Sequence, residues 1–148
     1  MRDLKMKKSI IFILCLLLYA FSSEAGPALP ARLGGAVLVD GVKLTSSASG
    51  FLFKFTCKDG KDFYPPAEDK DGLNKKGIYI IDIPIYDPAS QPEGAKPGST
   101  GVIHVFREGA ELRVAEPYLG EFTIGKGGTI THLDLFILSK GDGSMKKN

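Results

Sequence analysis

The side chains with the most evident chemistry are the acidic and amide groups of the loop 68–74, Glu68-Asp69-Lys70-Asp71-Gly72-Leu73-Asn74. Hard cations such as Ca²⁺ take several oxygen ligands at flexible spacing. Asp69, Asp71 and Asn74 therefore form a candidate Ca²⁺ site. Any further carboxylate has to come from elsewhere in the sequence, from Asp82 or Asp87. The same loop is also a turn sequence, because Asp, Asn and Gly form turns without an ion.

Other reactive side chains are few and scattered. His104 and His132 each lie in an expected strand, and neither has a second ligand at the spacing of a transition-metal site. His132 shares a strand face with Asp134, as a surface hydrogen-bonded pair would. The sequence has no Gly-x-Ser-x-Gly turn, and no pair of carboxylates stands out for glycoside hydrolysis. We therefore expect that the protein is not an enzyme.

Cys57 is the one cysteine beyond the first 25 residues. A single cysteine cannot form a disulfide within its own chain. We expect a buried thiol that acts as a small apolar residue, with pairing between two chains as the alternative. A chain of this length buries a core without such a covalent link.

The segment 1–25 has the pattern of a secretory signal peptide. Basic residues precede the apolar run 10–21, and Ser23 and Ala25 give the small-x-small pattern that predicts cleavage after Ala25. The run is shorter than the roughly 20 apolar residues of a membrane span, so no span is expected after cleavage. We expect a secreted or periplasmic protein, with an uncleaved N-terminal anchor as the alternative.

Cleavage also changes the charge of the chain. The 148 residues carry a formal charge of +2, and residues 1–25 hold four of the 19 Lys and Arg but only two of the 17 Asp and Glu. The remaining chain is neutral. It has no basic patch of the kind that contacts a nucleic-acid backbone, so nucleic acid is not an expected partner.

The elements that must position these side chains are β-strands. The stretch 77–87 is the richest in β-branched and aromatic residues, with Tyr79, Ile81, Ile83 and Ile85 on one face. Pro84 cannot donate to a ladder and is expected at an edge, a bulge or the end of the strand. Further strands are expected at 35–39, 51–57, 102–106, 111–115, 120–124 and 130–138, with short returns at 42–44 and 62–64. No window has the apolar period of a helix.

Seven or eight short strands separated by turn signals predict an all-β fold, an antiparallel Greek-key β-sandwich of the immunoglobulin-like kind. Long connections on both sides of 77–87 favour the Greek key, because a crossing between sheets needs length. The expected organisation is a signal peptide (1–25), a lead-in linker (26–33), a sandwich domain (34–138) and a disordered polar tail (139–148).

Four short segments of this domain are similar to segments of known modules: Gly77-x-Tyr79, Ile83-Pro84, Gly94-Ala95-Lys96-Pro97-Gly98 and the strand 102–106. Over residues 34–138 the chain resembles the immunoglobulin-like and carboxypeptidase-regulatory-like (transthyretin-like) β-sandwich modules of secreted bacterial proteins. The resemblance implies a non-catalytic module for adhesion, for carbohydrate contact or for holding other domains.

The sequence thus predicts an exported, non-catalytic binding or structural protein of the cell envelope or extracellular space. Its partner would be a protein, a surface polysaccharide or a second copy of the chain. The expected contact surface is the edge near Pro84 with the loop 87–101. The alternative is a small Ca²⁺-binding or carbohydrate-binding module that uses the loop 68–74. No cofactor is expected apart from the Ca²⁺ of this alternative.

Overall fold

The computed structural model describes residues 26–139 as a β-domain with two short 3₁₀ segments. The strands are β1 (Ala31–Val39), β2 (Val42–Lys43), β3 (Phe51–Cys57), β4 (Asp62–Phe63), β5 (Ile78–Ile83), β6 (Thr100–Arg107), β7 (Ala110–Glu116), β8 (Glu121–Thr123), β9 (Ile130–His132) and β10 (Leu135–Leu138). The 3₁₀ segments are η1 (Lys70–Gly72) and η2 (Tyr118–Gly120). Across this range no helix is long and apolar enough to cross a membrane. The predicted signal peptide, and the predicted tail beyond its first residue, lie outside the described residues.

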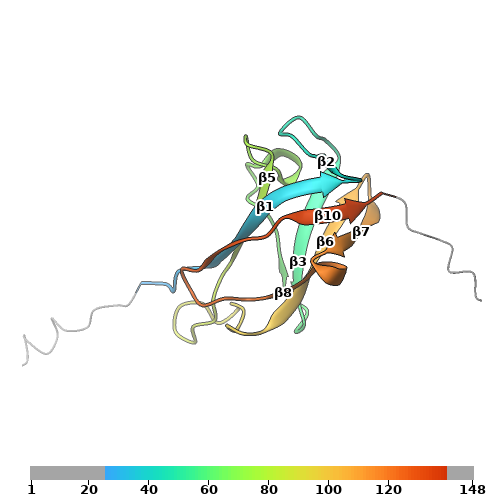
Figure 1. The fold of residues 1–148 in the computed structure, drawn as a ribbon. Coiled ribbons are helices and arrows are strands. Elements are labelled where there is room, and N and C mark those ends of the chain that lie inside the picture. The colour runs from blue at the N-terminus through green and yellow to red at the C-terminus, as the bar shows by residue number, and fades with distance from the viewer. Residues whose placement is uncertain (1–25, 140–148) are drawn as a thin grey trace, which may run out of the picture.

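The ten strands form one mixed sheet, and its main path runs in the order β2-β1-β10-β7-β6-β3-β4 (Figure 1). Off this path, β5 and β9 pair with β1, and β8 pairs with β6. The prediction of an all-β fold is confirmed. The predicted count of seven or eight strands is too low, because the short returns β2 and β4 are strands and the predicted strand 130–138 is divided in two.

β1 gives the sheet its mixed character. It runs antiparallel to β2 and β5 but parallel to β9 and β10. The prediction of a purely antiparallel fold is therefore wrong at these parallel pairs. The reason is that the last segment of the chain returns beside β1 in the same direction, so these strands are not joined to β1 as hairpin neighbours would be.

β1 begins at Ala31, within the predicted lead-in linker 26–33. Arg32 explains this early start, because it lies opposite Asp82 of β5 and its guanidinium donates two hydrogen bonds of 2.7 Å to that carboxylate. The Arg32 guanidinium also holds the pKa of Asp82 below its ordinary value. The Arg32 backbone N–H donates to the carbonyl oxygen of Thr129 at 2.8 Å. The sheet thus includes the end of the predicted linker.

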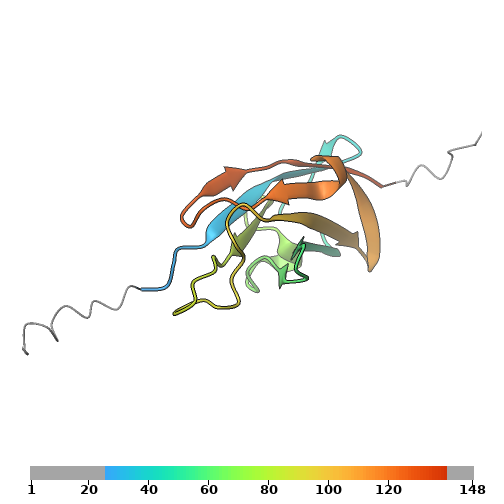
Figure 2. The same cartoon turned by 90° about the horizontal axis from the view of Figure 1, so that it is seen from below.

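The core lies on the inner face of the sheet, where the period of two in the sequence predicts it. The fully buried side chains on this face include Leu33, Val37, Phe53, Phe55, Tyr79, Ile81, Ile83, Ile103, Val105, Leu135 and Ile137. The rings of Phe53 and Tyr79 stack at 5.6 Å between centroids, although β3 and β5 are not neighbours in the sheet. The sheet therefore curls so that distant strands share one core. Figure 2 shows the red strands and the green segment around β4 on opposite sides of this interior.

The predicted strand 130–138 is interrupted at Leu133 and Asp134 by a change in hydrogen-bond partners. The register against β1 stays constant across the interruption, since Gly34 lies opposite His132 and Val37 opposite Leu135. In between, the backbone N–H of Ala36 donates to the Asp134 carboxylate at 2.7 Å instead of to a backbone carbonyl. The side chain of Asp134 thus replaces one bond of the ladder.

At the interruption between β9 and β10, the backbone carbonyl of Leu133 points towards the core. A Cβ atom at Gly35 would overlap the carbonyl oxygen of Leu133, so this approach requires glycine. Tyr79 lies opposite Gly35 on β5, and its hydroxyl donates to the same oxygen at 2.7 Å. Burial raises the pKa of Tyr79 far above its ordinary value. The central tyrosine of the core therefore satisfies a carbonyl that the sheet leaves without a strand partner.

Substitution Tyr79→Phe is expected to lower the free energy of unfolding by about 1–3 kcal/mol, because the Leu133 carbonyl oxygen would lose its buried donor. Urea unfolding followed by circular dichroism measures this change. Tyr64→Phe, at a side chain that is 51% exposed, is the control and should cost less than about 0.5 kcal/mol. Equal losses in the two variants would contradict the assigned role of the Tyr79 hydroxyl.

The stability of the native protein should also fall in alkali through Tyr79. The unfolded chain ionises this hydroxyl at about pH 10, whereas burial keeps it protonated in the folded chain. Its contribution is therefore complete below about pH 10 and is lost as the pH rises, by up to about 1.4 kcal/mol per pH unit. Between about pH 10 and 12 the unfolding free energy of Tyr79→Phe should decline less steeply than that of the native chain. Identical slopes would show that the hydroxyl is not buried.

Candidate functional site

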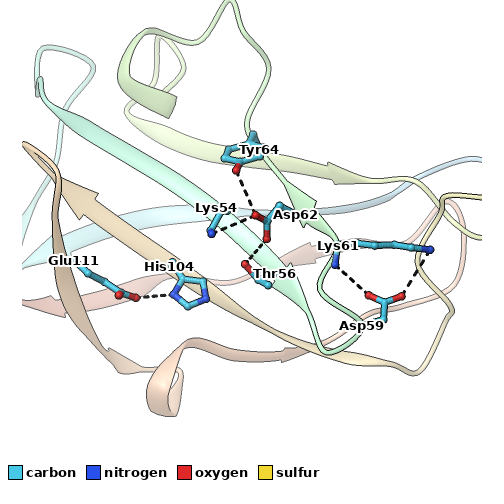
Figure 3. Close-up of polar contacts among 8 residues, drawn as sticks. All are labelled: Lys54, Thr56, Asp59, Lys61, Asp62, Tyr64, His104 and Glu111. Atoms are coloured by element: carbon cyan, nitrogen blue, oxygen red, sulfur yellow. Dashed lines mark hydrogen bonds and ion pairs between the residues drawn. The ribbon is translucent and has the colours of Figure 1, made fainter.

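A row of polar side chains crosses the outer face of the sheet over β4, β3, β6 and β7. We call it the polar row, and it consists of Asp62, Thr56, Lys54, His104 and Glu111. Alternation turns Lys54 and Thr56 outward on β3 and turns His104 outward on β6. Lys54 lies opposite His104 in the antiparallel pair β3–β6, and Asp62 of β4 lies opposite Thr56. Figure 3 shows these groups with Glu111 of β7 on one side of the sheet.

Asp62 is the acceptor at one end of the polar row. Thr56 Oγ1 donates to its carboxylate at 2.6 Å, and Lys54 Nζ lies 3.3 Å from the second carboxylate oxygen. The Tyr64 hydroxyl lies at 3.5 Å. These donors, the Thr56 hydroxyl first among them, hold the pKa of Asp62 below its ordinary value. Asp62 is therefore ionised at neutral pH, with Lys54 as its counter-charge.

His104 and Glu111 form the other end of the polar row. His104 Nδ1 lies 2.6 Å from Glu111 Oε1, and the His104 side chain is 28% exposed. The ring of Phe106, two residues further along β6, stacks on the imidazole at 6.3 Å between centroids. Because Glu111 engages Nδ1, the second ring nitrogen, Nε2, is the atom through which this imidazole would meet a ligand.

A break in the pairing along β6 adds two cavities beside His104. β8 pairs with residues 100–102 and β7 with residues 105–107, so neither strand covers the edge at 103–104. η2 passes close to this point, since a Cβ atom at Gly120 would overlap the carbonyl oxygen of Ile103. The larger cavity, of about 380 Å³, is lined by Val102, Ile103, His104, Glu111, Leu112, Arg113, Val114 and Leu119. The smaller, of about 160 Å³, is lined by Thr56, Cys57, Lys58, Thr100, Gly101, Val102, His104 and Glu121.

The two cavities share Val102 and His104, so the imidazole stands between them. Their walls combine charged donors, carboxylate acceptors and apolar side chains, a combination suited to a ligand that needs both orientation and contact area. Cys57, at the edge of the smaller cavity, is only 4% exposed and packs in the core, as the sequence predicts, and burial raises the pKa of its thiol. This thiol is therefore neutral at pH 7 and a poor nucleophile.

The predicted Ca²⁺ ligands Asp69, Asp71 and Asn74 lie in the loop before β5. Asn74 Oδ1 accepts the backbone N–H groups of Lys76 at 2.8 Å and Ile78 at 3.2 Å. This is the turn-forming role that the sequence offers for Asn. A cavity of about 590 Å³ beside the loop is lined by Ser46, Glu68, Asp69, Leu73, Asn74 and Lys75.

The additional carboxylates suggested for this site, Asp82 and Asp87, have other partners. Asp82 binds Arg32, as described above. Asp87 Oδ1 accepts the backbone N–H groups of Ser90 at 2.9 Å and Ala89 at 2.8 Å, which hold its pKa below the ordinary value. Over residues 26–139, no group of three or more His, Cys, Asp and Glu side chains is arranged to hold a metal ion.

The predicted contact surface near Pro84 is used in part by the chain itself. Pro84 follows the last residue of β5, as its missing N–H predicts, and its carbonyl accepts the N–H of Ala95 at 2.7 Å. Gln91 Nε2 donates to the carbonyl of Ala28 at 2.6 Å, and Lys61 Nζ donates to that of Gly94 at 3.1 Å. The loop that follows β5 is thereby fixed to the body of the domain.

None of the residues of the polar row is among the site residues that the sequence predicts, although signals for parts of the row exist. The Asp59-Gly60 turn predicts that Asp62 returns beside Thr56, and the Glu108-Gly109 turn predicts a hairpin that brings β7 beside β6. The sequence contains no signal that β3 pairs with β6. His132 and Asp134 are in contact, with 3.1 Å between Nε2 and Oδ1, although Asp134 lies between β9 and β10 and not in the strand.

The fold and this site define an all-β domain with a polar, hollowed outer sheet face. Comparisons with protein-family models, with curated proteins and with solved structures find no match to the chain. A fold class alone does not determine function, so the function has to be argued from the groups in the site.

Proposed function

We propose that this chain is an exported, non-catalytic binding module that holds a hydroxyl-rich polymer, such as a surface polysaccharide, on the polar row. The observation that carries the proposal is the position of His104, which Glu111 holds in place between two adjoining cavities. Sugar hydroxyls both donate and accept hydrogen bonds. Ammonium, imidazole and carboxylate groups that are held in a row match such a ligand.

The shape and the rims of this face support a polymer rather than a small molecule. The two cavities adjoin along β6, so successive sugar units of an extended polymer would occupy them in turn. Two exposed aromatic rings with a polar tip belong to segments beside this face: Tyr64, whose hydroxyl lies 3.5 Å from Asp62, is 51% exposed, and Tyr118, which precedes the cavity residue Leu119 in η2, is 73% exposed. Such rings offer apolar area to a sugar face and a hydroxyl to its rim.

Other features of the chain support the remainder of the proposal. The stacking of Phe53 on Tyr79 across the interior supports a sandwich of the immunoglobulin-like Greek-key kind, with parallel pairs beside β1. The signal-peptide pattern of residues 1–25 supports export. The buried, neutral thiol of Cys57 supports a binding role over a catalytic one.

The test uses affinity electrophoresis and titration calorimetry with a neutral glucan and an acidic uronate polymer. His104→Ala and Lys54→Ala are expected to weaken binding at least about tenfold, or about 1.4 kcal/mol, because each removes a group from the centre of the polar row. Both residues are partly exposed, so the variants should fold normally.

His132→Ala is the matched control for these variants. Like His104, His132 lies in a strand and contacts one carboxylate, but it is 74% exposed and lies on β9. Its removal should leave polymer binding unchanged. Failure of the folded native protein to bind either polymer, or equal losses in both histidine variants, would refute the proposal.

The second candidate is a Ca²⁺-binding module that uses Asp69, Asp71 and Asn74. The cavity beside the loop, with Glu68 and Asp69 in its wall, favours it. A cation that binds only the folded chain raises its stability by mass action, so about 10 mM Ca²⁺ should raise the melting temperature by about 2–8 °C. Asp69→Asn should remove this shift, because Asp69 lies in the wall of the cavity, and Asp59→Asn, in the turn before β4, should not. No heat on titration and no melting shift at millimolar Ca²⁺ would exclude this candidate.

A further inference from the structure

A second outer face of the sheet, over β5, β1 and β9, is largely apolar. We call it the β1 face, and its outward side chains include Leu29, Arg32, Ile78, Ile80, Asp82, Ile130 and His132. Ile130 is 77% exposed and Leu29 is 70% exposed. Apolar side chains gathered on one exposed face are typical of an interaction surface.

The strand register arranges this face around a glycine. Two rows of residues cross the three strands, Asp82–Arg32–Ile130 and Ile80–Gly34–His132. Because Gly34 has no side chain, the second row is low at its centre. A cavity of about 160 Å³ opens there, with Ile80, Ile130 and His132 in its wall. Ile130 therefore projects from the surface immediately beside a hollow, the Gly34 hollow.

The fixed charges at the centre of the β1 face, Arg32 and Asp82, are balanced within it, and His132 beside them contacts Asp134. Two hydrogen bonds join the Arg32 guanidinium to the Asp82 carboxylate, and these side chains are 48% and 36% exposed. A positively charged partner surface would repel Arg32, and a negatively charged one would repel Asp82. A second copy of the same face brings one guanidinium and one carboxylate, so it meets no net repulsion. The segment 26–148 as a whole is also neutral.

We propose that the β1 face is the interface of a homodimer, in which Ile130 of each copy enters the Gly34 hollow of the other. A two-fold axis makes such an interface self-complementary, because each copy supplies both the projection and the hollow. This inference goes beyond the proposed function and does not depend on it. The dimer would present two polar rows on one particle, and a repeating polymer would be held by both.

The experiment measures sedimentation velocity and light scattering over protein concentrations from about 1 µM to about 1 mM. The full chain is expressed with its own N-terminal segment and purified in the form that the cell produces. The native protein should pass from monomer to dimer within this range. Ile130→Asp and Leu29→Asp should weaken dimerisation at least about tenfold, since each places a carboxylate in the apolar contact.

Val42→Asp is the matched control, because Val42 is an equally exposed strand residue, at 69%, on β2 outside the β1 face. It should dimerise like the native protein. Both test residues lie at the margin of the sheet, because Ile130 is the first residue of β9 and Leu29 precedes β1. A substitution at either position is therefore expected to leave the fold intact. Thermal unfolding checks that each variant is folded.

Three results would overturn the homodimer. The first is a native protein that stays monomeric at about 1 mM. The second is a dimer that Ile130→Asp and Val42→Asp weaken equally, which would place the interface elsewhere. The third is a monomer that sediments with phosphatidylglycerol and phosphatidylcholine vesicles and loses this binding in Ile130→Asp, which would assign the face to a lipid surface.

Discussion

The hydrogen bond from the Tyr79 hydroxyl to the carbonyl oxygen of Leu133 connects the beginning, the middle and the end of the domain. Gly35 of β1 makes room for the carbonyl, β5 supplies the tyrosine, and the segment between β9 and β10 supplies the oxygen. Leaving this oxygen unpaired in the core would cost about 1–3 kcal/mol. This bond and the Asp134 carboxylate, which accepts the Ala36 N–H, bridge the interruption in the parallel return of the chain beside β1.

The two outer faces of the sheet have different chemistry because they have different neighbours across the strands. On β3 and β6, outward positions hold a lysine, a threonine and an imidazole, and β4 and β7 add a carboxylate at each end. On β5 and β9, outward positions hold the isoleucines Ile78, Ile80 and Ile130, and Gly34 of β1 lies between Ile80 and His132. One domain thus offers a hydrogen-bonding surface and an apolar surface, and these suit different kinds of partner.

Local alternation made much of this predictable. The common face of Tyr79, Ile81 and Ile83 follows from a period of two, the buried thiol of Cys57 from its apolar character, and the end of β5 before Pro84 from the missing N–H of proline. The side-chain oxygen atoms of the loop 68–74 predicted a Ca²⁺ site. The amide oxygen of Asn74 turned out to be bonded to backbone N–H groups, a choice that sequence spacing leaves open.

By itself, the sequence determined that this is an all-β chain, which residues of its long strands point inward, and that its reactive side chains are few. Those properties depend on neighbours within a few residues along the chain. Only the tertiary structure decided that β3 pairs with β6, that the last strands run parallel to β1, and that His104 stands between two cavities. These features join residues far apart in sequence, and strand alternation is equally compatible with many such pairings.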